Sequence, residues 1–102
     1  MYARMSIYEI DRDRVEDTVA RFRDAIETIS YMEGLRDAFF LVSGDGERAV
    51  ALTLWQTHDA MTASRVTASR LRSEAVRDVE GSIVSVDEFD VALHEQGRSD
   101  GP

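Results

Sequence analysis

Residues 39–56 read FFLVSGDGERAVALTLWQ, which is two apolar runs of strand composition joined by a short polar turn. Asp45 followed by Gly46 is a strong hairpin signal, because the tight turn between two strands needs residues that tolerate a positive φ. The stretch therefore predicts two antiparallel strands, over residues 36–43 and 48–56, in the middle of the chain.

The segment before the hairpin predicts one strand and one amphipathic helix. Residues 2–10 alternate partly and are rich in β-branched and aromatic residues, as strands are. Asp11 or Asp13 would cap the helix, with Asp13 and Glu16 in a capping-box-like pair, and Gly34 would end it. Its apolar stripe recurs at helical spacing: Val15, Thr18, Val19, Phe22, Ala25, Ile26 and Ile29.

The segment after the hairpin repeats this pattern. Thr57 or Asp59 would cap a second helix that runs to about Val79, with Gly81 ending it. Residues 82–93 then predict the fourth strand. The stripe of the second helix is smaller and more polar than that of the first: Met61, Ser64, Ala68, Leu71 and Ala75.

The order strand, helix, strand occurs twice. It predicts an α+β fold of the ferredoxin-like βαββαβ type, a four-stranded antiparallel sheet with two helices on one face. One domain is expected over residues 1–95, followed by a disordered tail over residues 96–102.

The hairpin strands are apolar on both faces, whereas a sheet covered on one side should alternate apolar and polar residues. In the third strand, Val50, Leu52 and Leu54 share one face. The other face also carries apolar side chains, and no further element of the chain remains to cover a second face. We therefore expect a homodimer in which two sheets meet through this face.

The overall charge restricts the classes of partner. The chain has 102 residues, a formal net charge of −8, no cysteine and two histidines. Nucleic acid and anionic membranes are not expected partners, since both need a clustered basic surface. No metal site is expected either, because cysteine is absent and histidine is scarce. The chain shows neither a signal peptide nor an 18-residue apolar run, so we expect a cytoplasmic protein.

Residues 55–61, WQTHDAM, close the third strand and open the second helix. This segment resembles the W-x-[ST]-x-[DE]-A signature of antibiotic biosynthesis monooxygenase-like domains, in the dimeric α+β barrel superfamily, and the resemblance covers residues 2–93. It implies a dimer with a pocket between sheet and helices in each subunit. Some members oxidise aromatic phenols to quinones with O2 and no cofactor, and others bind and degrade haem.

The resemblance implies that Trp55 lines the pocket, where its ring could stack on a planar substrate. His58, beside a helix N-terminus that disfavours its charged form, is the candidate general base, and Tyr8 is a candidate hydrogen-bond partner. The further candidates for substrate contact are Ser6, Thr53, Phe39 and Arg65. Each candidate also has a purely structural interpretation: Trp55 in the core, His58 in a solvated loop, Tyr8 at an interface, and Arg65 on a solvated helix face.

Three functions follow from these observations. The first is cofactor-independent oxygenation of an aromatic or polyketide-like phenol. The second is a non-catalytic module, for small-ligand binding or stress response, which the scarcity of acid–base groups near Trp55 favours. The third is haem binding through a ligand other than the usual axial histidine. The resemblance implies that the haem-degrading members carry an axial histidine on the helix after the tryptophan and an asparagine on the first strand. Residues 60–79 contain no histidine and the chain contains no asparagine, so haem degradation by the family mechanism is not expected. Asp87, Glu88 and Asp90 are interpreted as charges on an edge strand, which oppose aggregation.

Overall fold

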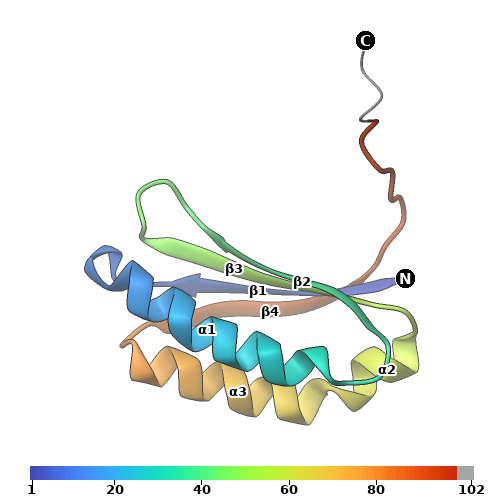
Figure 1. Ribbon diagram of the computed structural model, residues 1–102, viewed down its shortest axis with the longest axis horizontal. Coiled ribbons are helices and arrows are strands. Elements are labelled where there is room, and N and C mark those ends of the chain that lie inside the picture. The colour runs from blue at the N-terminus through green and yellow to red at the C-terminus, as the bar shows by residue number, and fades with distance from the viewer. Residues whose placement is uncertain (99–102) are drawn as a thin grey trace.

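The computed structural model describes residues 1–98 and has the predicted ferredoxin-like arrangement, with a four-stranded antiparallel sheet and helices on one face (Figure 1). The order of strands across the sheet is β2-β3-β1-β4, so β2 and β4 are the edges. The elements are β1 (Tyr2–Glu9), the 3-10 turn η1 (Arg12–Arg14), α1 (Val15–Ser30), β2 (Leu35–Val42), β3 (Arg48–Trp55), α2 (His58–Ala63), α3 (Arg65–Asp78) and β4 (Ser82–Asp90).

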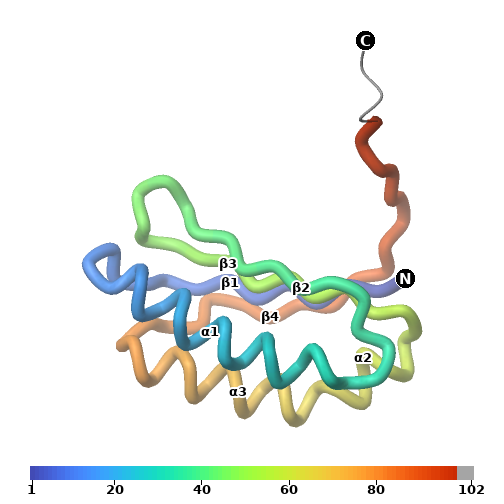
Figure 2. Tube along the Cα trace, in the orientation of Figure 1, coloured from blue at the N-terminus to red at the C-terminus, as the bar shows by residue number. Residues whose placement is uncertain are grey.

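The chain after β4 is neither helix nor strand over residues 91–98, so the last strand ends three residues before the predicted position 93. The remainder of the predicted tail, residues 99–102, lies outside the described residues. Figure 2 shows that residues 91–98 lead away from the sheet at the end where β4 stops.

The β2–β3 hairpin forms where Asp45 and Gly46 predicted it. Gly46 has φ 73°, and its N–H donates to the Ser43 carbonyl at 2.9 Å. A Cβ at Gly46 would stand 3.2 Å from side-chain atoms of Arg12 and Val15. Both the backbone conformation and the space therefore favour glycine here.

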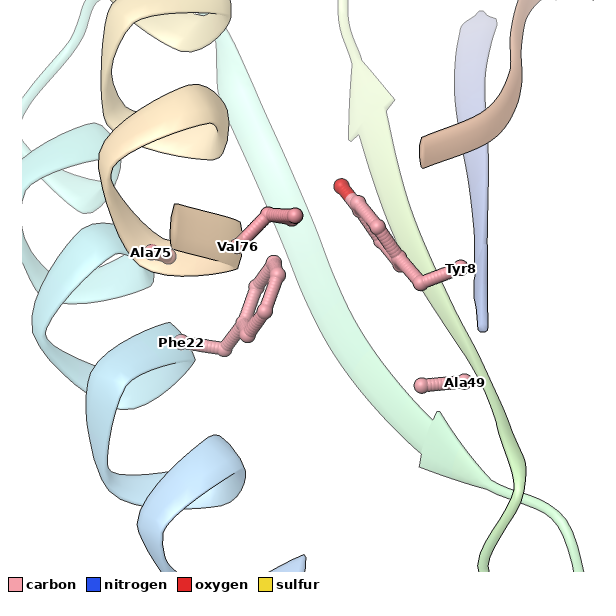
Figure 3. Packing of buried hydrophobic residues seen from close by; sticks show 5 residues of the cluster. All are labelled: Tyr8, Phe22, Ala49, Ala75 and Val76. Atoms are coloured by element: carbon pink, nitrogen blue, oxygen red, sulfur yellow. The ribbon is translucent and has the colours of Figure 1, made fainter. Parts of the chain in front are cut away.

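The first helix packs its predicted stripe against the sheet, but neither Asp11 nor Asp13 is its N-cap, since α1 begins after Arg14, which makes no side-chain cap hydrogen bond. The Asp11 side chain accepts from the Asp13 N–H at 2.9 Å and starts η1. Phe22 lies flat against Phe40, with ring centroids 4.4 Å apart, and tilted against Tyr8, at 4.9 Å. Figure 3 shows the rings of Tyr8 and Phe22 reaching toward each other from β1 and α1.

The single long second helix that the sequence predicted is two helices, α2 and α3, which meet at Ser64. The Thr57 side chain caps α2 by accepting from the Ala60 N–H at 3.1 Å. Ser64 is fully buried, and its hydroxyl donates to the Met61 carbonyl at 2.7 Å. Because this hydroxyl also accepts from Arg4, a buried side chain on the sheet holds the junction in place.

The face of the sheet away from the helices remains uncovered in the single chain. Phe39, Leu41 and Phe89 are 45%, 52% and 48% exposed. Across the sheet, Phe39 pairs with Leu52, and Leu52 with Met5, so apolar residues continue from β2 into β1 on one face. The homodimer remains a prediction that this surface supports.

Candidate functional site

A narrow cavity lies between the sheet and the helices α1 and α3. The space open to the centre of a water molecule is about 40 Å³, which suits about three waters. Strand positions two apart point to the same face, so β1 and β3 each place alternate residues on the cavity wall. The lining residues are Arg4, Ser6 and Tyr8 from β1, Ala51 and Thr53 from β3, Phe22, Ala25, Ile26 and Ile29 from α1, and Ala68, Leu71 and Arg72 from α3.

Tyr8 is a hydrogen-bond donor at the sheet wall of this cavity. Its side chain is 1% exposed, and burial raises the pKa of the phenol, while the Ser6 hydroxyl and the Arg72 guanidinium act in the opposite direction. The Tyr8 hydroxyl therefore keeps its proton near neutral pH, and it can donate a hydrogen bond but cannot act as a base there.

Arg4 is a fixed positive charge on the same wall, 4% exposed. Its guanidinium donates to the Ser64 hydroxyl at 3.0 Å and to the Met61 carbonyl at 2.8 Å. It also donates to Glu88 Oε2, from Nη2 at 2.9 Å and from Nε at 3.2 Å. The guanidinium carbon is 5.8 Å from the ring centroid of Trp55, within the range in which an aromatic face attracts a cation.

Glu88 on β4 is held between two arginines. Arg65 Nε donates to both carboxylate oxygens at 3.1 Å, and Arg65 Nη2 bonds Oε1 as well. The hydrogen bond from Arg65, with a further contribution from Arg4, lowers the pKa of Glu88 to about 2. Glu88 is therefore part of a charged bridge between α3, β1 and β4, and not the solvated edge charge that the sequence suggested.

An open depression of about 370 Å³ adjoins the cavity between α3 and β4, and Arg4 and Arg72 line both spaces. We call this depression the arginine mouth. Its lining residues are Arg4, Arg65, Ser69, Arg72, Val86, Asp87 and Glu88.

The structure brings only some of the predicted site residues together. Ser6, Tyr8 and Thr53 line the cavity. Arg65 lies at the arginine mouth. Phe39 lies on the uncovered face of the sheet. It pairs with Leu52, and Leu52 lies between the two cavity-lining positions of β3 and so points to the opposite face.

Trp55 and His58 do not share a cavity in this structure. Trp55 is 0% exposed and belongs to the core with Ile29 and Met61. Its indole N–H donates to the Thr53 hydroxyl at 2.9 Å, so Trp55 orients a cavity residue but is not among the lining residues. His58 is the exposed first residue of α2 and makes an edge contact with the Tyr2 ring at 5.5 Å.

Arg4 and Arg72 line the cavity, whereas the sequence singled out only Arg65 among the arginines as a candidate for substrate contact. Arg4 carried a usable signal, because it alternates with Ser6 and Tyr8 and so had to share their face of the strand. Arg72 carried a weaker one, since it is four residues from the stripe position Ala68 and next to Leu71.

Two further properties of residues 1–98 concern metal ions and membranes. No group of three or more histidine, aspartate or glutamate side chains in that range is placed to hold a metal ion. No helix in the same range is both long and apolar enough to cross a membrane.

Comparison by sequence finds relatives without a known role. No family model matches the sequence. The chain is 27% identical over 101 residues to two uncharacterized proteins of Mycobacterium tuberculosis, MT2634 of strain CDC 1551 / Oshkosh and Rv2557 of strain ATCC 25618 / H37Rv. The match covers 97% of this chain but 45% of each relative, so the chain spans a little under half of their length.

Comparison by structure is more informative about the fold. MupZ from Pseudomonas fluorescens superposes with a TM-score of 0.71 at 22% identity, over 85% of this chain and 65% of MupZ. A putative antibiotic biosynthesis monooxygenase from Deinococcus radiodurans gives 0.77 at 8% identity, over 95% and 100%. SnoaB, a cofactor-independent oxygenase from Streptomyces nogalater, gives 0.75 at 14% identity, over 91% and 94%. The chain therefore has the fold of the antibiotic biosynthesis monooxygenase-like proteins, as the segment WQTHDAM predicted.

Proposed function

We propose that this chain oxidises a small phenol with O2 in the cavity between the sheet and the helices α1 and α3, without a cofactor. One observation carries the proposal: the cavity is mostly apolar but places two guanidinium groups, Arg4 and Arg72, beside the hydroxyls of Ser6 and Tyr8. The fold shared with SnoaB, itself a cofactor-independent oxygenase, supports the same reaction class.

The arginines offer a way to activate the substrate without a general base. A phenolate transfers an electron to O2 far more readily than a phenol does, so the first requirement is loss of the phenol proton. The lining residues include no histidine, aspartate or glutamate. A nearby positive charge lowers the pKa of a phenol, whereas burial raises it, as it does for Tyr8 in the same cavity. The proposal therefore requires Arg4 and Arg72 together to outweigh burial at the substrate hydroxyl, and water would take the proton.

The overall reaction balances without another reactant. One oxygen atom of O2 becomes the new carbonyl of a quinone, and the other leaves as water with the two hydrogens lost by the phenol. The four electrons that reduce O2 come from the aromatic ring. The Tyr8 hydroxyl and the two guanidiniums would stabilise the negative charge that develops on oxygen.

The size of the cavity limits the substrate. About 40 Å³ of water-accessible space is small even for a single ring. A single-ring phenol would need modest movement of side chains such as Leu71, and a polycyclic phenol would need α1 and α3 to move away from the sheet. We therefore propose a single-ring substrate.

The second candidate function is a module that binds a small apolar ligand without reacting with it. The absence of an ordinary base among the cavity-lining residues favours it. Haem binding is the third candidate, and titration with haem, followed at the Soret band, tests it directly.

We also propose that the protein is a homodimer through the uncovered face of the sheet. The exposed side chains of Phe39, Leu41 and Phe89 support this, because apolar surface on a sheet is stabilised when a second copy removes it from water.

Oxygen uptake in the presence of 2-methylphenol, whose free para position permits quinone formation, tests the reaction. Ala25→Leu, on the cavity side of α1, should abolish uptake by filling the cavity. Ala20→Leu, at an exposed position of the same helix, is the matched control and should leave uptake unchanged. Binding of the phenol without quinone formation would favour the binding module, and equal uptake by both variants would contradict the proposed site.

A further inference from the structure

We propose that the arginine mouth binds a carboxylate carried by the ligand, and that Glu88 occupies this position in the empty protein. The ligand would then be an aromatic hydroxy acid, with its ring in the cavity and its carboxylate between α3 and β4. The assignment of the ring as a reacting phenol rests on the proposed function, whereas the carboxylate contact rests on the mouth itself.

The mouth places donor groups along one face of α3. Arg65, Ser69 and Arg72 follow one another at intervals of four and three residues, so their side chains lie on the same side of the helix. A planar guanidinium can bind both oxygens of a carboxylate with two parallel hydrogen bonds. The helix therefore presents two such groups, with a hydroxyl between them, at the edge of the sheet.

Glu88 shows that this position accepts a carboxylate. Its oxygens receive hydrogen bonds from both Nε and Nη2 of Arg65 and from Arg4. Arg72 lines the same depression, and among residues 1–98 it takes part in no ion pair. A ligand carboxylate could thus bind Arg72 and Ser69 at once, and it could replace Glu88 at Arg65, which is half exposed.

The charge of the mouth contrasts with that of the whole chain. The lining includes three arginines against the two carboxylates of Asp87 and Glu88, whereas the chain has a formal net charge of −8. A local positive site on an acidic protein attracts anions to that place and repels them elsewhere. Because Arg4 and Arg72 line both spaces, an anionic group held there would stand next to the apolar cavity.

A matched pair of probes tests the proposal on the full chain. 3-Hydroxybenzoate and 3-hydroxybenzamide have the same ring and hydroxyl, but only the first carries a carboxylate. We expect the acid to bind at least about tenfold more tightly than the amide by calorimetry, the factor expected for one charge-assisted contact. The Nε–H resonances of Arg65 and Arg72 should shift on addition of the acid.

Variants locate the effect. Arg65→Gln should weaken binding of the acid about tenfold and leave binding of the amide unchanged, because Arg65 lines only the mouth. Arg72→Gln should weaken binding of the acid more than binding of the amide, because Arg72 lines both the mouth and the ring cavity. Arg70→Gln is the matched control, because Arg70 is on the same helix but pairs with Glu74 outside the mouth. Glu88→Gln should tighten binding of the acid, since no internal carboxylate then competes, and a thermal melt shows whether this variant remains folded.

Equal affinity for acid and amide, undetectable binding of both, or unchanged preference in Arg65→Gln and Arg72→Gln would overturn the proposal. The outcome is independent of catalysis. Selective binding of the acid without oxygen uptake would contradict the proposed function alone. Oxygen uptake with 2-methylphenol, together with equal affinity for the two probes, would contradict this inference alone.

Discussion

Replacing Glu88 by glutamine should destabilise the folded protein at neutral pH but not in acid. The pKa of Glu88 lies at about 2 in the folded protein, compared with its usual 4.5, chiefly because Arg65 donates hydrogen bonds to the charged carboxylate. A shift of this size corresponds to about 3 kcal/mol of folding free energy. Since Arg65 is 51% exposed, solvent screening reduces the expected value to about 2 kcal/mol.

The sign of the pH dependence follows from the direction of the shift. The folded pKa is below the unfolded one, so the stabilisation is fully present above about pH 4.5 and is lost as the pH falls toward 2. At about pH 2.5 the wild-type carboxylate is largely protonated in the unfolded state and partly protonated in the folded state. The difference in the free energy of unfolding between wild type and Glu88→Gln should therefore decrease steadily as the pH falls from about 4.5 to about 2.5.

Urea unfolding at constant protein concentration, followed by the fluorescence of the single tryptophan, measures this difference at several pH values. Trp55 is fully buried and reports on the core. Asp87→Asn is the matched control on the same strand, because among residues 1–98 Asp87 forms no ion pair. The reasoning would be refuted if the free energies of unfolding of wild type and Glu88→Gln differed by the same amount at pH 7 and at about pH 2.5. It would also be refuted if they differed by less than about 0.5 kcal/mol at pH 7.

Three further predictions concern the fold and the assembly. Gly46→Ala should cost about 1 kcal/mol in urea unfolding, since φ is 73° there, whereas Gly44→Ala, with open space around it, should cost much less. Ser64→Ala should cost about 1–2 kcal/mol in the same assay, because Arg4 loses a buried acceptor. Leu41→Glu should convert the proposed dimer to a monomer in sedimentation velocity, whereas Val66→Glu, on the exposed surface of α3, should not. A monomeric wild type would contradict the proposed interface.

Local signals predicted the elements of this fold well. The Asp45–Gly46 turn fixed the hairpin, and helical spacing from Val15 to Ile29 fixed the first helix, because both patterns act within a few residues. Alternation along β1 also placed Ser6 and Tyr8 on one wall. These are the parts of the candidate site that the sequence could predict.

The errors occurred where a distant residue decides the local structure. Helical periodicity in the sequence continues through Ser64, but the helix is interrupted at that residue. The buried guanidinium of Arg4, 60 residues away along the chain, donates a hydrogen bond to the Ser64 hydroxyl. The sequence also gave no indication that Glu88 and Arg65 meet, since 23 residues and the end of a helix separate them.

The sequence by itself determined the order of elements, the antiparallel hairpin and the apolar character of both sheet faces, because backbone propensity and side-chain periodicity are local properties. Tertiary structure alone decided that Trp55 is packed in the core, that His58 faces solvent, and that Arg4 and Arg72 share a cavity wall. The physical reason is that charge and burial at a site depend on which elements meet across the sheet. The short segment WQTHDAM therefore identified the fold, and the packing around it moved the candidate chemistry from His58 to the arginines.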